Sequence, residues 1–291
     1  MSVLAQAVEA SVVTGAIYAS VGVGFVLIFR SSAVLSFCQG GFMLLGSFLF
    51  YGLVTTNHVG FLPAMLISVA VVTAFGAGVY ILVFARTAAR AAFSTSVATI
   101  GLGGVIVSIV ALKYGTSPRA LPDVVSTRAF HVFSAVVPTT DIVAVAITVV
   151  MVGILLLILK FTSVGTRMQA VADSPGLSIH LGISAARVAA LAWAMAAASA
   201  AFAGVAFALR SSVDPVGVSN VGLYAFPAII LGGLNSIEGV LAGGMILAVI
   251  QQSVQYAIGA NWVDIVSFIV MLGVLWWKPS GFFGRADVVR V

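Results

Sequence analysis

Long apolar runs separated by short polar breaks dominate the pattern along the chain. Residues 142–159, for example, contain no charged residue. Because a helix rises about 1.5 Å per residue, that run approaches the roughly 30 Å hydrocarbon core of a bilayer. The pattern predicts membrane helices over residues 10–29, 33–55, 61–84, 93–113, 141–160, 186–209, 238–258 and 262–278. We therefore expect an all-α integral membrane protein whose residues 1–291 form a single polytopic domain.

A ninth apolar piece, residues 222–234, is too short to span a bilayer comfortably and runs directly into the sequence GGLNSIEG. A re-entrant or broken helix is the expected form for such a piece. Counting it as a crossing would give nine crossings, so the number of true crossings within residues 222–258 stays open.

Composition and charge agree with a membrane protein. The chain is 62% hydrophobic and 7% charged, whereas a soluble domain carries roughly 25% charged residues. The net charge is +5, but the basic residues occur singly between apolar segments and form no patch. This arrangement disfavours nucleic acid as a partner.

The basic residues predict the orientation, because cytoplasmic loops carry an excess of Lys and Arg. One side of the predicted topology carries Arg30, Arg86, Arg90, Lys160, Arg167, Arg187, Lys278, Arg285 and Arg290. The other side carries Lys113, Arg119, Arg128 and Arg210. We therefore expect an external N-terminus, a cytoplasmic C-terminus and a cytoplasmic 160–187 loop, while the external 114–140 loop is a candidate docking surface.

The polar stretch KFTSVGTRMQAVADSPGLSIHLGISAAR, residues 160–187, contains helix signals of its own. Ser174 and Pro175 form an N-cap and first-turn pair, Gly182 is a plausible stop, and Ser184 can cap the next helix. Leu177 and Leu181, four residues apart, would lie on one side of this short helix and present an apolar knob to the aqueous phase. The alternative is a tightly packed loop between two helices.

Several kinds of chemistry are absent from the sequence. No Gly-Lys pair occurs, so the chain has no Walker A motif, and neither HExxH nor GxSxG is present. Cys38 is the only cysteine, and His58, His131 and His180 lie in three different polar regions, so we expect neither a metal site nor a cofactor. The acidic residues near the apolar segments lie at segment ends, where water can reach them: Glu9, Asp141, Glu238 and Asp264. An ion-driven carrier would usually need a charge near a helix centre.

The polar groups left inside the apolar segments are neutral. Ser36, Cys38, Gln39, Gly40 and Gly41 form a cluster in which polar residues and glycines coincide at the start of a helix. Ser96 and Thr99 add hydroxyl groups in a later segment. This set could line a substrate path, or it could serve helix packing and helix-to-helix hydrogen bonding; the sequence leaves both open.

Four stretches and the C-terminal end together resemble a known family. They are VLSFCQGGFMLLGSF (34–48), TIGLGGVIVSIVALKYGTSPRALP (99–122), AVADSPGLSIHLGISAARVAALAWAMAAASAAFAGV (170–205), AFPAIILGGLNSIEGVLAGG (225–244) and KPSGFFG (278–284). In this order they resemble the permease subunits of bacterial ABC importers for branched-chain amino acids, whose close relatives carry urea and short amides.

The resemblance implies an inverted-repeat-like importer permease in the bacterial inner membrane. It implies as partners a second permease subunit, with a heterodimer as the expected form, two cytoplasmic ATPases and an extracytoplasmic substrate-binding protein. It assigns ATPase coupling to the loop that contains Asp173, Pro175, Leu177, His180, Leu181 and Gly182. The chain itself would hydrolyse no ATP.

Two departures from the family pattern concern the solute. The family's His-Gly-Glu is Gln39, Gly40 and Gly41 here, and many relatives have proline where this chain has Glu238. Without the His and Glu, the path makes no ionic contact at this level, which favours a neutral or zwitterionic, partly apolar solute. A passive channel for a small neutral solute such as urea or an amide is the alternative, while an intramembrane enzyme is disfavoured because no catalytic constellation is present.

Overall fold

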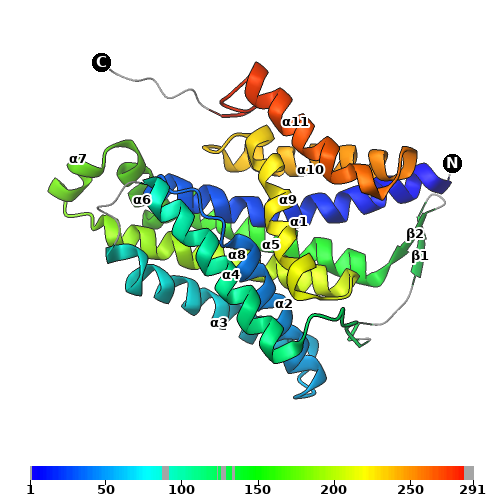
Figure 1. Ribbon diagram of the computed structural model, residues 1–291. Coiled ribbons are helices and arrows are strands. Elements are labelled where there is room, and N and C mark those ends of the chain that lie inside the picture. Colours follow the sequence, from blue (N-terminus) through cyan, green and yellow to red (C-terminus); the bar gives the residue numbers. More distant parts are fainter. Residues whose placement is uncertain (1, 87–91, 123, 126–128, 133–134, 285–291) are drawn as a thin grey trace.

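The computed structural model describes residues 2–86, 92–122, 124–125, 129–132 and 135–284, and these parts are almost wholly helical (Figure 1). The longer helices are α1 (Ser2–Ser32), α2 (Gln39–Thr55), α3 (Phe61–Leu82), α4 (Ala92–Tyr114), α5 (Thr139–Phe161), α8 (Ala185–Arg210), α9 (Pro215–Gly232), α10 (Ile237–Ala257) and α11 (Val263–Trp277). The shorter helices are η1 (Phe84–Arg86), α6 (Ser163–Asp173), α7 (Pro175–His180) and η2 (Ala260–Trp262). One antiparallel hairpin joins β1 (Ala129–Val132) to β2 (Ala135–Pro138).

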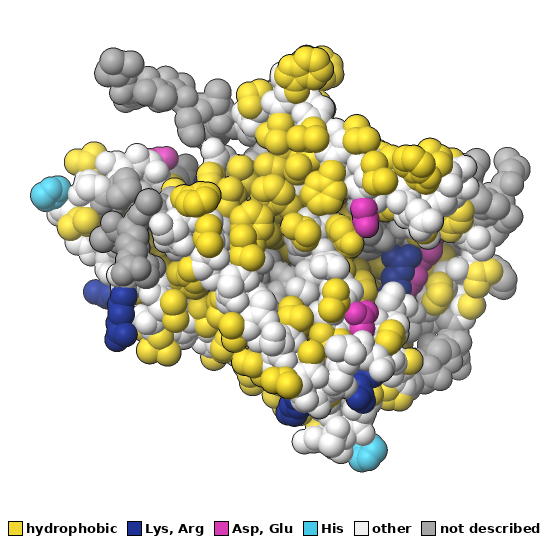
Figure 2. All heavy atoms as spheres, viewed as in Figure 1, with side chains coloured by type: hydrophobic (Ala, Val, Ile, Leu, Met, Phe, Trp, Pro, Cys, Tyr) yellow, Lys and Arg dark blue, Asp and Glu magenta, His cyan; other side chains and the backbone are white. Residues whose placement is uncertain are grey.

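The all-α membrane fold is confirmed. Among the described residues, eight helices are long and apolar enough to cross a membrane: α1, α3 continued through η1, α4, α5, α8, α9, α10, and α11 with η2. Apolar side chains are spread over the face seen in Figure 2, with few charged side chains among them, as expected for a surface that contacts lipid. The protein is thus held in the bilayer by lipid-facing apolar residues on nearly every long helix.

Two helices differ in length from the sequence prediction. The apolar piece 222–234 belongs to α9, which begins earlier, at Pro215, and runs without a break to Gly232 although Pro227 lies inside it. The helix predicted from residue 33 is α2, which begins only at Gln39. It has 17 residues and is shorter than the eight candidate membrane-spanning helices. Asp214 explains the early start of α9, because its side chain caps the helix by accepting from the Gly217 N–H at 2.7 Å.

Helix α8 lies at the centre of the bundle and packs against α1, α2, α3 and α5. Its alanine-rich sequence permits this, because small side chains let helix backbones approach closely. A Cβ added to Gly46 of α2 would lie 2.6 Å from the Cα of Ala201, and one added to Gly204 of α8 would meet the carbonyl group of Met43. The core of the fold therefore contains close contacts between the backbones of α2 and α8.

The predicted division of the chain into two ends is visible in the packing. At one end α1, α5 and α8 meet: Arg210 donates to the Thr14 hydroxyl at 3.1 Å and lies 3.9 Å from the Asp141 carboxylate. Asp141, expected within reach of water, is in fact only 6% exposed, because it pairs with Arg210 between the helices. Arg119 pairs with Val213 through backbone hydrogen bonds at the same end.

The opposite end carries α6, α7 and the ends of α1 and α5. Arg30 and Lys160 line one cavity there, in line with the grouping predicted for the basic residues. Four members of the basic sets lie outside the described residues: Arg90, Arg128, Arg285 and Arg290. The structure separates the two ends without identifying which of them is cytoplasmic.

Candidate transport path and coupling surface

Residues 33–38 form a non-helical break between α1 and α2; Ala33 is exposed, and the other residues of the break are partly or fully buried. Irregular backbone at membrane depth is tolerated only where protein or a cavity surrounds it, and both Ser36 and Cys38 are fully buried here. The hydroxyl of Ser36 lies 3.0 Å from the sulfur of Cys38. The break therefore has polar groups satisfied within the protein.

Helix α4 holds this break in place. The backbone N–H of Phe37 donates to the Thr99 hydroxyl at 2.9 Å, and that hydroxyl donates to the carbonyl oxygen of Ser96 at 2.6 Å. Phe37 also packs its ring against Phe226 of α9, with ring centroids 5.4 Å apart. Four of the residues singled out in the sequence, Ser36, Cys38, Ser96 and Thr99, thus lie together at the junction of the break with α4.

Gln39 faces a different place, the junction of α1, α2 and α8. A Cβ added to Gly24 of α1 would lie 2.8 Å from both the Gln39 Nε2 and the Ser199 Oγ, which locates the amide beside that glycine. The side chain is fully buried, and among the described residues neither of its amide atoms has a hydrogen-bond partner. Such a group is costly to bury, so Gln39 is the unsatisfied polar centre of the bundle.

The two glycines after Gln39 are packing positions in this conformation. A Cβ on Gly40 would meet the carbonyl oxygen of Ser219 in α9, and one on Gly41 would lie 3.1 Å from the Cδ1 of Ile106 in α4. Gly222 of α9 in turn approaches the backbone of Gly40. The start of α2 is thus wedged between α4 and α9 in the described conformation. The assignment of these residues to a substrate path stays a prediction.

The polar stretch 160–187 folds into two short helices, α6 and α7. Most signals predicted from the sequence have their expected places: Pro175 begins α7, Gly182 has φ +75°, and the Ser184 hydroxyl accepts from the Arg187 N–H at 3.4 Å. Ser174 precedes α7 in the N-cap position, but its side chain makes no capping hydrogen bond. Asp173 ends α6 and His180 ends α7. Helix α6 was not predicted; Met168 and Val171 anchor it in the core.

Helix α7 presents apolar side chains to the outside of the chain. Leu177 is 65% exposed, Ile179 65% and Leu181 75%, and we call these three residues the α7 knob. Ser178 on the inner side is buried and donates to the Ser174 carbonyl at 2.9 Å. The alternative of a tightly packed loop is therefore excluded, because this segment carries the exposed α7 knob. Ile179 belongs to the knob, but the four-residue spacing of Leu177 and Leu181 did not predict it.

Sequence reasoning also missed Ser20, Gly24 and Ser199. The Ser20 hydroxyl donates to the Ser199 carbonyl at 2.9 Å, and the Ser199 hydroxyl to the Ala196 carbonyl at 2.9 Å. These groups lie near Gln39 only because of how α1, α2 and α8 pack against one another. No motif within one segment predicts that packing.

A polytopic helical bundle with a buried polar break and an exposed apolar knob, but without a nucleotide-binding sequence, defines a membrane-spanning transport subunit. The comparisons specify the family. A family model described as "Branched-chain amino acid transport system / permease component" matches residues 7–275, and the chain belongs to this family. It is accordingly a multi-pass, non-catalytic permease component of the ABC transporter class.

Known relatives match over nearly the whole chain. The high-affinity branched-chain amino acid transport system permease proteins LivH of Salmonella typhimurium and of Escherichia coli K12 are each 25% identical over 297 residues, covering 96% of this chain and 95% of the relative. The corresponding protein BraD of Pseudomonas aeruginosa is 24% identical over 290 residues, covering 95% of this chain and 94% of the relative.

Proposed function

We propose that this chain is one of two permease subunits of an importer that moves a branched-chain or other apolar amino acid across the bacterial cytoplasmic membrane. The second permease chain, two cytoplasmic ATPases and an extracytoplasmic binding protein would complete the complex. The names of the relatives support the solute class, and the neutral groups of the 36–41 segment suit a zwitterion with an apolar side chain.

The observation that carries the proposal is the α7 knob. Leu177 and Ile179 lie on a six-residue helix and Leu181 directly follows it; three exposed apolar side chains at the aqueous end of a membrane protein have a free-energy cost unless a partner covers them. Apolar anchors in a partner's groove are the usual centre of a protein interface. An ATPase that binds the α7 knob would move α7. This movement would pass to α8, whose first turn is capped by Ser184.

The orientation belongs to the same proposal. Of the basic residues in the described parts, Arg30, Arg86, Lys160, Arg167, Arg187 and Lys278 go with the α6–α7 end, and an excess of basic residues is typical of the cytoplasmic side. The N-terminus would then be external, and the hairpin β1–β2 would face the binding protein.

Affinity purification of the tagged chain from membranes of its own cells tests this function. We expect an ATPase subunit and a second permease chain to co-purify with it. Proteoliposomes that contain the chain alone should pass no urea or amide. Solute flux through the chain alone, with no ATPase bound, would instead favour the passive channel.

A further inference from the structure

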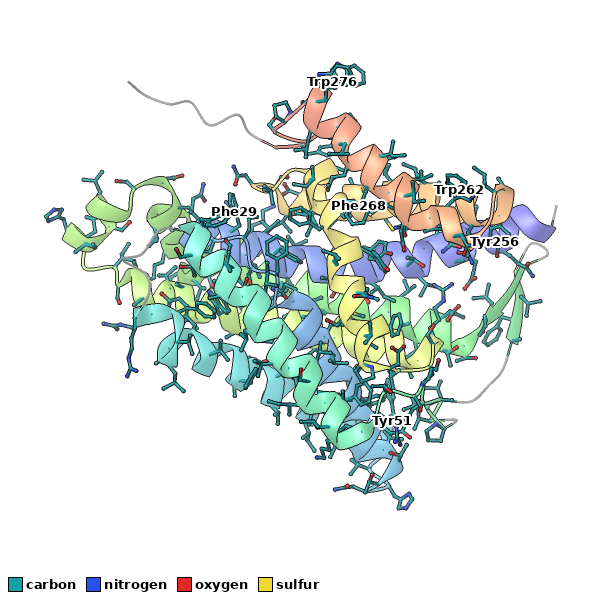
Figure 3. The ribbon with its side chains drawn as sticks, in the orientation of Figure 1. Phe29, Tyr51, Tyr256, Trp262, Phe268 and Trp276 are labelled. Carbon is teal, nitrogen blue, oxygen red and sulfur yellow. The ribbon has the colours of Figure 1, made fainter. Side chains whose placement is uncertain are left out.

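A cavity of about 1620 Å³ lies at the α6–α7 end of the molecule, among α1, α5, α6 and α8. Its inner walls are apolar and include Phe29, Phe84, Leu156 and Val171; Phe29 is labelled near the end of α1 in Figure 3. This volume is larger than the roughly 300–1,000 Å³ of most small-molecule sites. A long apolar ligand fits it better than a small solute.

The cavity extends to the lipid-facing side of α5. Leu157 and Phe161 border it and are 57% and 73% exposed. Helix α4, which contributes Thr95 to the cavity, packs on α2 and α9, whereas α5 packs on α1 and α8. Helices α4 and α5 therefore lie on two sides of the opening and pack against different helices. An acyl chain can enter the cavity between them from the bilayer.

Charged side chains of both signs line the same cavity. They are Arg30 and Lys160 on one hand and Asp173 and Glu238 on the other, so their formal charges cancel. In the described part of the chain none of the four makes an ion pair, and Lys160, Asp173 and Glu238 are exposed. The wall is thus polar where it reaches the surface and apolar deeper in the protein.

A buried donor beside the cavity also lacks an acceptor. Trp193 borders the cavity, and its indole Nε1 is buried without a hydrogen-bond partner among the described residues. The ring is fixed by stacking on Phe84, with centroids 4.6 Å apart. Buried polar groups of native proteins are nearly always hydrogen-bonded, so this N–H is an unsatisfied donor behind the wall of the cavity.

We propose that this cavity binds a phospholipid with a zwitterionic, primary-amine headgroup, that is, a phosphatidylethanolamine, from the leaflet at the α6–α7 end. The phosphate lies between Arg30 and Lys160, since basic pockets between membrane helices bind phospholipid headgroups. The ammonium group donates to Asp173 or Glu238, which line the same cavity. One acyl chain fills the apolar part.

The charge balance selects this headgroup over others. An anionic phosphatidylglycerol leaves both carboxylates without a counter-charge, and the quaternary amine of phosphatidylcholine has no N–H to donate to them. A free amino acid has the matching charges but leaves most of the apolar volume unfilled. The bound lipid would brace α6, which forms part of the wall, against α1 and α5, and the proposal requires only a membrane-spanning chain, not coupling to an ATPase.

The test measures lipid retention by the purified, delipidated complex. The three phospholipids with identical acyl chains are added in detergent micelles, and bound lipid is counted by native mass spectrometry beside the melting temperature. We expect phosphatidylethanolamine to be bound about tenfold more than phosphatidylcholine, the ratio that one charge-assisted hydrogen bond supplies, and only phosphatidylethanolamine to raise the melting temperature.

Variants then locate the site. Glu238→Gln and Lys160→Gln change exposed side chains, so the fold should survive. Together with Asp173→Gln, Glu238→Gln should reduce phosphatidylethanolamine binding toward the phosphatidylcholine level, because both carboxylates that could accept from the ammonium group are then neutral. Lys160→Gln removes a phosphate contact and should reduce the binding of all three lipids. Lys113→Gln, an exposed change on α4 at the opposite end, is the matched control and should bind like the wild type. Equal retention of all three lipids by the wild type, unchanged selectivity when both carboxylates are replaced, unchanged binding in Lys160→Gln, or stabilisation by free leucine instead of lipid would overturn the proposal.

Discussion

At the residue scale, the contacts around the start of α2 differ from one residue to the next. Gly40 and Gly41 lie against α9 and α4, while Gln39 turns toward α1 and α8. Neighbouring residues that looked equivalent in the sequence therefore have different surroundings. The glycines allow the backbone of α2 to approach α9 and α4 closely. The amide of Gln39 is not needed for packing, because an apolar side chain of equal size would fill the same space.

The first prediction concerns Gly40. In the Gly40→Val variant the added carbon atoms meet the Ser219 carbonyl, a backbone group that cannot move aside without moving α9. We expect a loss of stability of about 1–3 kcal/mol, typical of overpacking, measured as a lower melting temperature of the purified chain. Gly104→Val is the control, because a Cβ there meets nothing within 4 Å. Equal melting temperatures for both variants would contradict this packing role.

The second prediction concerns Gln39 and the substrate path. Trp at this position would overpack three helices, so Met, which is unbranched and of similar size, is the informative replacement. Because the amide has no protein partner in the described residues, Gln39→Met should preserve stability or raise it by up to about 3 kcal/mol. If the amide contacts the solute during transport, uptake into vesicles falls.

Gln252→Met provides the comparison for that variant. Gln252 lies on α10, and its amide donates to the Thr14 hydroxyl at 3.5 Å, away from the 36–41 segment. Its replacement should leave uptake unchanged. Wild-type uptake by a folded Gln39→Met complex would remove Gln39 from the path.

Local signals at this scale could be read from the sequence only in part. The coincidence of Ser36, Cys38 and two glycines indicated a special segment, and the helix break found there agrees with it. That Thr99 would accept from Phe37, or that Gln39 would lie beside Gly24, depends on how distant helices pack. No spacing within one segment contains that information.

At the element scale, helix caps were the most informative signals. Ser184 placed the start of α8 correctly because side-chain capping acts within one turn. Pro175 marked the first turn of α7 and Gly182 the turn after it, although the Ser174 side chain makes no capping hydrogen bond. The bounds of α2 and α9 were less predictable. The apolar run from residue 33 continues through a break that only tertiary contacts stabilise, and the cap that starts α9 is Asp214, eight residues before the apolar piece 222–234.

The third prediction tests α7 as a coupling element. In Leu181→Asp a charge replaces an apolar side chain that is 75% exposed in the chain but would be buried against the ATPase. A buried unpaired charge costs several kcal/mol, so the ATPase should no longer co-purify. The fold should survive, since Leu181 makes little contact within the chain. Retention of the ATPase by Leu181→Asp would remove the α7 knob from the interface.

Ser117→Asp is the matched control for Leu181→Asp. Ser117 is exposed at the opposite end of the bundle, so the same charge is added there without touching α7. Its complex should keep the ATPase at the wild-type level.

At the scale of the whole molecule, the apolar pattern was sufficient for the fold class. Every long apolar run corresponds to a helix, because a helix is the only open-chain structure that satisfies its own backbone groups in lipid. The pattern could not supply the central place of α8 or the large cavity. Both arise from contacts between segments far apart in the chain.

The fourth prediction is the orientation. The N-terminus should be external and residues 160–187 cytoplasmic, because basic residues concentrate at the α6–α7 end. With Cys38 buried, single cysteines at Ser2 and Ser117 should react with a membrane-impermeant reagent in intact cells. One at Thr166, which is exposed on α6 and lies outside the α7 knob, should react only after lysis. Labelling of position 166 in intact cells would refute the orientation.

The most direct test of the whole account is uptake by the reconstituted complex. Proteoliposomes that contain this chain, its permease partner and both ATPases should accumulate leucine only when ATP is supplied on the ATPase side and the binding protein on the other. The same vesicles with Leu181→Asp should hydrolyse ATP no faster than the basal rate and accumulate nothing. Leucine entry that is independent of ATP, or unaffected by Leu181→Asp, would contradict the account.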